Sequence, residues 1–319
     1  MTCGRGMDAN GPKVKVAVVG VGHLGQHHAR IYTELPGVEL VAIADTSDMR
    51  RREVGGRLKV RSVADYRSLI GTVDAVSVAV PTGSHYPIAL AFLQAGSDVL
   101  VEKPITQTVG EADLLIAAAA KGSRILQVGH SERYNGAVQA LSARVHDPAF
   151  IEVHRMGPFP NRGTDVDVVL DLMIHDIDII LTLVKSPVTS VSAVGVPVVS
   201  GQVDIANARL EFASGCVANI TASRVSGERL RKIRVFQRDT YFVLDYANQE
   251  LNLFRKTAGD ASSSKTRLTR IEVPVDRVEP LRQELADFLE SVRLRRPPLV
   301  SGEAGREAVM VATQIIERL

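Results

Sequence analysis

The sequence predicts an α/β protein with two domains, a parallel sheet in the first and an antiparallel or mixed sheet in the second. Up to residue 128, continuous apolar strands alternate with helices, which indicates a parallel sheet covered on both faces. From residue 188, consecutive strands separated by turn signals indicate antiparallel pairing. The 319 residues are long enough for two such domains.

The first part of the chain is predicted from short β-branched runs that alternate with helical stretches. A glycine turn follows the first strand and opens the first helix, and Gly96 and Gly122 stop two later helices. The predicted strands are residues 14–19, 39–44, 74–80, 98–101 and 124–128. The predicted helices run from the glycine turn to about residue 35, over 84–95 and over 109–121.

The second part of the chain changes pattern after Gly129. One long helix is expected over about residues 165–184, strands over about 188–275, a polar hairpin tip at 258–264, and helices at 280–294 and 302–319. We therefore expect a disordered tail at 1–12, a first domain at 13–128 and a second domain at 129–319. The C-terminal helix can pack back on the first domain.

Composition and charge exclude several classes of protein. The net charge is +2, which gives no electrostatic case for nucleic acid or a membrane surface as a partner. No apolar run approaches eighteen residues, and the first dozen residues lack the apolar core of a signal peptide, so the cytoplasm is the expected compartment. Cys3 and Cys216 are too few for a disulfide framework or a cysteine zinc site. Of the 38 basic residues only nine are Lys, which makes any Lys at a motif notable.

A glycine motif, G-V-G-H-L-G at residues 20–25, lies between a predicted strand and a predicted helix. The first glycine permits the tight turn, the second lets backbone approach a pyrophosphate, and the third lets helix pack on strand. Asp45 ends the next strand, where a carboxylate accepts hydrogen bonds from a ribose diol and repels a 2′-phosphate. The motif therefore favours NAD over NADP, with Arg50–Arg52 as a counterargument and a glycine turn that binds nothing as the alternative.

Two further motifs follow strands at the same predicted sheet edge. Pro81, Thr82 and His85 come after one strand, and Glu102, Lys103 and Pro104 close the next. Ligands in open α/β sheets lie outside these strand ends, where a Lys can polarise a substrate oxygen. The alternatives are ordinary polarity at a helix start for His85 and a surface position for Lys103.

The predicted helix at 165–184 carries Asp171, His175 and Asp178 at spacings of four and three residues, beside an apolar stripe. Three ionisable groups in this position are costly unless they face a cleft. His175 is suited to accept a proton near neutral pH, and Asp171 can orient its imidazole. A solvated helix face is the alternative. A metal site is a weaker one, because no third ligand occurs at a fixed spacing, and we predict none.

These motifs together resemble one family. G-V-G-H-L-G, Asp45, P-T-x-x-H ending at His85, E-K-P around Lys103 and D-x-x-x-H from Asp171 to His175 occur in this order, as in the Gfo/Idh/MocA oxidoreductases. The resemblance implies a Rossmann domain joined to an α/β domain with a large open, mostly antiparallel sheet that commonly forms oligomers, here a homodimer or homotetramer. It also implies NAD(P)-dependent oxidation or reduction at a sugar or polyol carbon, with Lys103, Asp171 and His175 as the catalytic set.

The finer resemblance is to the branch that includes UDP-N-acetylglucosamine 3-dehydrogenases. It rests on D-L-M-I-H-D-I-D around His175 and on G-H-S-E-R-Y-N at residues 129–135. Forked arginine donors suit a diphosphate, so a nucleotide sugar is the expected substrate, although solvated arginines explain the pattern equally well. The residues expected to bind substrate are Arg133, Tyr134 and Arg162, with Arg155 nearby. The residues expected to bind the cofactor are Gly20, Gly22, His23, Leu24, Gly25, Asp45, Pro81, Thr82, His85 and Glu102.

Other functions remain open from the sequence. They are an inositol or free-sugar dehydrogenase of the same family, a reductase that works in the opposite direction, and a regulatory homologue that binds NAD without turnover. The intact Lys103, Asp171 and His175 argue against the regulatory protein, because a sensor has no need of them. His27 and His28 are expected to be packing or surface residues of the cofactor helix.

Overall fold

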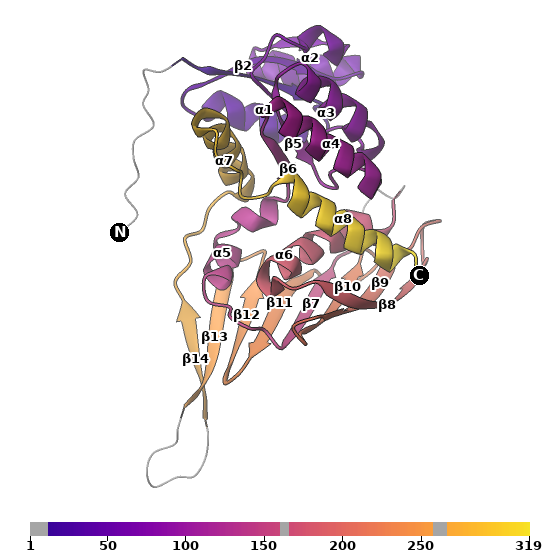
Figure 1. Cartoon of the computed structure of the whole chain (residues 1–319), viewed down its shortest axis with the longest axis vertical. Helices are drawn as coiled ribbons and strands as arrows, with labels where there is room; N and C mark the ends of the chain where they lie inside the picture. Colours follow the sequence, from indigo (N-terminus) through magenta and orange to yellow (C-terminus); the bar gives the residue numbers. More distant parts are fainter. Residues whose placement is uncertain (1–11, 160–165, 258–266) are drawn as a thin grey trace. The chain divides into compact units, whose positions relative to one another are not determined.

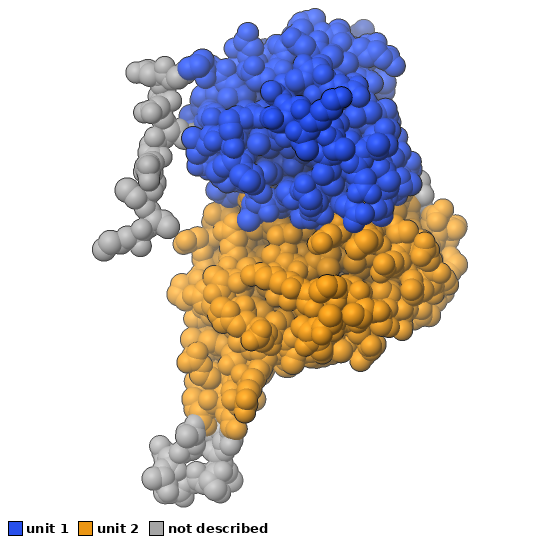
Figure 2. Space-filling view, viewed as in Figure 1, with its two compact units in different colours: residues 1–130, 281–306 blue, residues 131–280, 307–319 orange. Residues whose placement is uncertain are grey.

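A computed structural model describes residues 12–159, 166–257 and 267–319. The expected N-terminal tail up to residue 11, Arg162 and the polar hairpin tip at 258–264 lie outside these residues. The chain divides into two compact units, coloured in Figure 2. Unit 1 comprises residues 1–130 and 281–306, and unit 2 comprises residues 131–280 and 307–319.

Unit 1 contains a six-stranded parallel sheet with the strand order β3-β2-β1-β4-β5-β6 (Figure 1). Its strands are β1 Val14–Val19, β2 Val38–Ala44, β3 Arg61–Val63, β4 Ala75–Val78, β5 Asp98–Glu102 and β6 Leu126–Gly129. β4, β5 and β6 are buried at every residue, as the continuous apolar runs predicted. The predicted Rossmann sheet is therefore confirmed.

Helices cover this sheet. They are α1 Gly25–Glu34, α2 Asp48–Leu58, α3 His85–Gln94, α4 Val109–Gly122 and α7 Pro280–Leu294, with short 3-10 helices at Tyr66–Leu69 and Thr82–Ser84. Thr108 and Glu111 form a capping box at the start of α4. The polar helix α2 and the short strand β3 were not predicted, because neither has the apolar periodicity that marks an element in the sequence.

Helix α7 belongs to unit 1 although it lies near the end of the chain. Leu285, Phe288 and Val292 on α7 are buried in one hydrophobic cluster with residues of β1, β2 and α1. Burying such side chains contributes about 1.5–3 kcal/mol each. A side chain on α7 can therefore reach the interior of unit 1 behind α1, and Glu284 is completely buried.

Unit 2 contains an eight-stranded sheet with the order β14-β13-β12-β11-β7-β10-β9-β8. All pairs are antiparallel except β7 with β10, so the predicted mostly antiparallel sheet is confirmed. Its strands are β7 Phe150–Met156, β8 Val188–Val196, β9 Ile205–Phe212, β10 Val217–Ser223, β11 Leu230–Gln237, β12 Thr240–Asp245, β13 Glu250–Thr257 and β14 Arg267–Val273.

The helices of unit 2 include α5 Gly136–Ser142 and α6 Ile174–Val184, which Figure 1 shows on one face of the sheet. A 3-10 helix, η3, spans Ser131–Tyr134, and the boundary between the units falls within α8, Gly302–Ile316. Burial alternates along β7, which agrees with a sheet covered on one face. No helix in the described ranges is long and apolar enough to cross a membrane.

The helix predicted over residues 165–184 differs from the observed one at its start. The first turn, η4 Val169–Met173, is a π-helix that continues directly into α6. Asp167 caps this turn, because its Oδ1 accepts the backbone N–H groups of Val169 and Leu170 at 2.8 and 3.0 Å. A π turn is frequent at functional sites, and this one carries Asp171.

Candidate active site

The glycine motif forms the turn that the sequence predicted. Gly20 has a φ of +85°, and a Cβ there would lie 2.6 Å from Ala79 O. A Cβ on Gly25 would collide with Gly20 O, so both positions require glycine for packing within unit 1. A Cβ on Gly22 would meet nothing within 4 Å. The space beside Gly22 is open, which is the arrangement a pyrophosphate needs to approach the backbone.

Asp45 stands at the end of β2 and is held by backbone donors. Its Oδ2 accepts the N–H of Val21, and its Oδ1 accepts the N–H of Ser47, both at 2.8 Å. The carboxylate is half-buried and oriented by two loops at once. The remaining lone pairs of its oxygens can accept further hydrogen bonds, as a ribose diol requires.

Arg50, Arg51 and Arg52 were the counterargument to NAD, and each has a carboxylate partner in α2 or at its start. Arg50 contacts Glu53 at 3.2 Å, while Arg51 and Arg52 contact Asp48 at 3.1 and 2.9 Å. Arg51 also donates to the carbonyls of Asp45 and Thr46. These side chains are therefore engaged within the protein.

A pocket of about 630 Å³ opens beside the glycine turn. Five of the predicted cofactor residues contribute to its wall: Gly20, Gly22, His23, Asp45 and Pro81. The glycine turn, the acid at the end of β2 and this volume fit a dinucleotide. Leu24 and Gly25 begin α1, and Thr82 lies in a 3-10 helix after β4, outside the wall of this pocket.

His85 and Glu102, also predicted to bind the cofactor, lie deeper in unit 1. His85 is 1% exposed, and its Nδ1 and Nε2 each lie 2.8 Å from a carbonyl oxygen, those of Pro104 and Val80. Burial lowers the pKa of His85, so the ring is neutral and donates to one carbonyl at a time. It bridges the segments that follow β4 and β5. Its contact with the cofactor stays a prediction.

Lys103 follows β5 directly and is half-buried. The Lys103–Pro104 peptide bond is cis. The backbone N–H of Lys103 donates to Glu102 Oε2 at 3.3 Å, so the residue that precedes Lys103 also holds its backbone. Its catalytic role stays a prediction.

Asp171 and His175 belong to unit 2 and come from consecutive helical segments. Asp171 lies in the π turn η4 and His175 is the second residue of α6. Both are half-buried, while Ile174 between them is completely buried. The two polar side chains thus flank a core position, as the predicted stripe requires.

Asp178 departs from that stripe. It is 1% exposed, and Arg133 of η3 donates to both of its carboxylate oxygens at 2.7 and 2.9 Å. The expectation that Asp178 faces a cleft with Asp171 and His175 is therefore wrong, since a forked arginine neutralises it in the interior. Arg133 was expected to bind the substrate, and in the structure it pairs with Asp178. Tyr134 is buried.

Arg155 on β7 is the centre of a buried charged network in unit 2. It donates to both oxygens of Asp176 at 2.7 and 3.0 Å and to Glu132 at 3.1 Å, and its guanidinium lies over the ring of Tyr246. Burial alone would lower the pKa of Arg155, but the two carboxylates outweigh it and raise the pKa. Arg155 is therefore a permanent structural cation.

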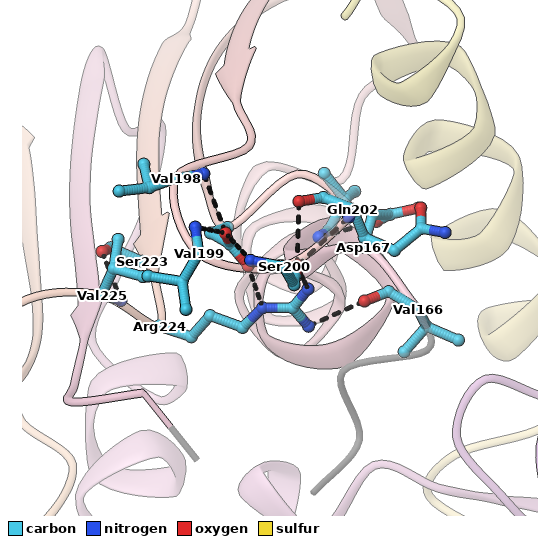
Figure 3. A network of polar contacts seen from close by, with 11 residues as sticks. Val166, Asp167, Val198, Val199, Ser200, Gln202, Ser223, Arg224 and Val225 are labelled. Atoms are coloured by element: carbon cyan, nitrogen blue, oxygen red, sulfur yellow. Dashed lines mark hydrogen bonds and ion pairs between the residues drawn. The ribbon is translucent and has the colours of Figure 1, made fainter. Parts of the chain in front are cut away.

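Arg224, which follows β10, is the centre of a second network, shown in Figure 3. It donates to Asp204 Oδ1 at 2.9 Å, to Ser200 Oγ at 3.0 Å and to the carbonyl of Val166 at 2.7 Å. Although burial opposes it, hydrogen bonds from Ser200, from backbone N–H groups and from Arg224 lower the pKa of Asp204. Because Val166 directly precedes the cap residue Asp167, this network fixes the start of the segment that carries Asp171 (Figure 3).

A pocket of about 420 Å³ in unit 2 adjoins both networks. Its wall contains Asp171, Ser223 and four arginines: Arg155, Arg224, Arg229 and Arg231. Arg155 and Arg224 are neutralised by buried carboxylates. Arg229 and Arg231 are exposed and have no carboxylate partner in the part of the chain that the structure describes. The pocket wall therefore carries two arginines without an ion pair among the described residues, next to the carboxylate of Asp171.

Sequence reasoning missed Arg229 and Arg231, and it missed the partners of the buried arginines. The only signal was residue type, because Arg231 lies on the same face of β11 as the buried Ile233 and Val235, so alternation does not mark it. Among 29 arginines that signal does not separate these two from the rest. Arg229 and Arg231 reach the pocket because β7 pairs with both β10 and β11, and the sequence does not reveal this pairing.

Comparisons with known proteins agree with the two units. Residues 14–130 match the oxidoreductase family with an NAD-binding Rossmann fold, and residues 132–240 match the GFO/IDH/MocA C-terminal domain. A UDP-N-acetylglucosamine 3-dehydrogenase from Acidithiobacillus ferrooxidans is 36% identical over 304 residues, which is 95% of this chain and 96% of that protein. A myo-inositol 2-dehydrogenase from Thermotoga maritima is 29% identical over 93% of this chain and 94% of that protein.

Solved structures give the same result. The structure of the A. ferrooxidans UDP-N-acetylglucosamine 3-dehydrogenase superposes with a TM-score of 0.89 at 35% identity, covering 96% of this chain and 98% of that one. A levoglucosan dehydrogenase in complex with NADH and levoglucosan superposes with a TM-score of 0.84 at 18% identity, covering 96% and 97%, which is a likeness of fold.

Proposed function

The chain belongs to the GFO/IDH/MocA family of NAD-binding oxidoreductases, and on that premise we propose that it oxidises the 3-hydroxyl of UDP-N-acetylglucosamine with NAD. The observation that carries the choice of substrate is the arginine-walled pocket beside Asp171. A nucleotide sugar brings a diphosphate, and guanidinium groups bind phosphate oxygens in a fork. An inositol or a free sugar is neutral and offers no anionic group to the two arginines.

The proposed reaction removes a hydride and a proton from one alcohol carbon and its oxygen. The hydride acceptor is the nicotinamide of bound NAD. His175 takes the hydroxyl proton, and Asp171 orients its imidazole and stabilises the positive charge that the ring gains. Lys103 holds the substrate oxygen and stabilises the negative charge that develops there. Arg229 and Arg231 hold the diphosphate, so that the sugar is presented in one orientation.

The substrate is tested by NADH formation with purified protein. UDP-N-acetylglucosamine is compared with N-acetylglucosamine and with myo-inositol. We expect turnover of the nucleotide sugar only, since both controls lack the diphosphate. If myo-inositol is turned over and UDP-N-acetylglucosamine is not, the proposed substrate is wrong. The function would then be that of the inositol dehydrogenases among the relatives.

The catalytic roles are tested by Lys103→Ala and His175→Ala. Each should lower kcat by about 10²–10⁴-fold, because each removes a charge-stabilising or proton-transferring group from the transition state, while the affinity for NAD stays near that of the native protein. Lys121→Ala and His146→Ala are matched controls at exposed positions of the same units. Full activity of His175→Ala would contradict the mechanism.

The phosphate-binding role is tested by Arg229→Gln and Arg231→Gln. Loss of one charged hydrogen bond of about 1.5–3 kcal/mol should raise KM for the nucleotide sugar by about 10–100-fold, with KM for NAD unchanged. Arg209→Gln, an exposed arginine on β9 that is paired with Glu211, is the control. If the wild type and the three variants have equal KM values for the nucleotide sugar, the pocket does not bind the substrate.

We also propose that the enzyme is cytoplasmic and forms a homodimer or homotetramer. The near-neutral charge and the resemblance to a family that commonly uses its large sheet for assembly support this. Light scattering coupled to size-exclusion chromatography measures the assembly. A single species with the mass of one chain would contradict it.

A further inference from the structure

Three ionisable side chains from distant parts of the sequence converge in the interior of unit 1. His28 comes from α1, Glu102 from the end of β5 and Glu284 from α7. They are 0, 6 and 0% exposed. Their nearest nitrogen and carboxylate oxygens all lie within 4.8 Å of one another. Burying two carboxylates this close is costly unless their charge is neutralised.

Glu102 has the partners of a charged carboxylate. The Nε2 of His28 lies at hydrogen-bonding distance, 2.9 Å, from its Oε1, and the backbone N–H of Lys103 donates to its Oε2 at 3.3 Å. The carboxylate of Glu102 lies against Gly129, where a Cβ would be 2.9 Å from Glu102 Cδ. The carboxylate is thus held from three sides, immediately before Lys103 in the chain.

Glu284 has the surroundings of a neutral carboxylic acid. Neither of its side-chain oxygens has a hydrogen-bond partner among the described residues, although both are completely buried. Burial, Glu102 and Asp287 raise the pKa of Glu284 well above its usual value. A bare charge here would have no hydrogen-bond donor among the described residues and would face a second carboxylate, whereas a proton removes the charge.

Among the described residues, the other charged groups that act on Glu284 are acidic, and His85 acts on Glu102 alone. Tyr32 of α1 is buried, its hydroxyl lies 2.7 Å from Ser77 Oγ, and burial raises its pKa, so it stays neutral. Asp287 of α7 is acidic and already contacts Arg296 at 2.7 Å. The groups that face Glu284 are therefore neutral or negative, apart from His28.

We propose that His28, Glu102 and Glu284 form a buried triad that positions Lys103, in which Glu102 carries the negative charge and Glu284 keeps a proton. The triad fixes the carboxylate that anchors the backbone of Lys103. Its effect on turnover rests on the proposed role of Lys103, whereas the protonation of Glu284 does not. None of the three is a catalytic residue, since they act through Lys103.

A divalent cation is the competing way to neutralise the cluster, because one imidazole and two carboxylates are suitable ligands. The hydrogen bond between His28 and Glu102 argues against it, since these two groups face each other directly. Elemental analysis of protein purified without chelators measures it. We expect no bound metal in stoichiometric amount, and one equivalent per chain would overturn the proposal.

The protonation of Glu284 is tested by the pH dependence of unfolding in the wild type and in Glu284→Gln, which needs no substrate. A carboxyl whose pKa is raised on folding stabilises the fold below its unfolded pKa, and that contribution is lost as pH rises toward the folded pKa. The neutral Gln variant has no proton to lose. The unfolding constant of the wild type, relative to the variant, should therefore rise by up to about tenfold per pH unit from pH 5 to 8.

A constant ratio of the two unfolding constants, or a ratio that falls with pH, would overturn the assignment. Difference infrared spectroscopy gives a second readout that does not depend on the stability of any variant. The wild type should show the carbonyl band of a protonated carboxylic acid, and Glu284→Gln should lose it. Persistence of that band in the variant would also overturn the assignment.

The positioning role is tested by an asymmetry between variants. Glu102→Gln and His28→Leu should lower kcat about tenfold or more, while Glu284→Gln, which replaces a neutral acid with a neutral amide, should lower kcat by less. His28→Gln restores a donor near the position of Nε2 and should recover most of the loss. Leu289→Ala places a packing defect elsewhere on α7 and should lower Tm without changing kcat. If the three residues only stabilise the fold, each substitution will lower Tm and leave kcat unchanged. That result would overturn the positioning of Lys103 by the triad.

Failure of the proposed function is distinguishable from failure of this inference. If no sugar in the panel is turned over, the pH dependence of unfolding and the infrared band still report the proton on Glu284. If UDP-N-acetylglucosamine is turned over but Glu284→Gln is as damaged as Glu102→Gln, the triad is wrong and the function stands.

Discussion

Two buried carboxylates of unit 2 and one of unit 1 are neutralised in opposite ways. In unit 2, Asp176 and Asp204 are completely buried, and each faces the guanidinium of a buried arginine, Arg155 or Arg224. In unit 1, Glu284 is equally buried but faces a second carboxylate and no arginine. The first arrangement neutralises charge with a counterion and the second with a proton. A counterion fixes the geometry of the carboxylate through forked hydrogen bonds, whereas a proton removes the charge without fixing a partner.

This difference matches what each unit has to hold. The arginine networks of unit 2 fix the start of the helix that carries Asp171 and build part of a pocket wall. The triad of unit 1 holds a single backbone position, that of Lys103. Removing a partner should therefore be most damaging in unit 2, where a bare charge would remain in the interior.

The largest expected effect is that of Arg155→Met. It leaves Asp176 buried without its counterion, so we expect a loss of about 3–5 kcal/mol in the free energy of unfolding, measured with urea. Burial already raises the pKa of Asp176 against the effect of Arg155. The variant should recover part of its stability at low pH, where Asp176 takes a proton. A loss below 1 kcal/mol would mean that the network is not a counterion site.

An intermediate effect is expected from Gly129→Ala in unit 1. The new Cβ would lie 2.9 Å from Glu102 Cδ, so the carboxylate must shift or the strand must move. Overpacking of this kind costs about 1–3 kcal/mol. The variant should also lose activity, because the group that anchors Lys103 is displaced. Unchanged stability and kcat would show that Glu102 is free to move and would weaken the comparison.

The smallest effect is expected where solvent screens the charge. Arg234 and Glu152 form a half-exposed pair on neighbouring strands of unit 2, with an N–O distance of 2.6 Å. Arg234→Met should change the free energy of unfolding by no more than about 1 kcal/mol. A loss as large as that of Arg155→Met would show that burial is not what separates these two arginines.

The local features of the fold could be predicted from the sequence. The glycine turn, Asp45 after β2 and the strand ends near Pro81 and Lys103 follow from short-range patterns, because a parallel strand, its turn and its helix are consecutive in the chain. The two sheets followed from the change between alternating and consecutive elements.

The charged networks could not be predicted in the same way. His28 meets Glu102 across 74 residues, and Arg133 meets Asp178 across 45, and no spacing rule relates such pairs. Asp178 was misplaced for this reason, since helical periodicity gives the direction of a side chain but not what it meets. The π turn at Asp171 shifted the start of the helix, which a regular 3.6-residue period does not anticipate.

The central claim is that this chain takes a hydride from a sugar carbon of a nucleotide sugar. The most direct measurement uses UDP-N-acetylglucosamine carrying deuterium at C3, with the isotope content of the NADH product measured by mass spectrometry. The account predicts one deuterium in each NADH formed. Formation of unlabelled NADH from this substrate would contradict it.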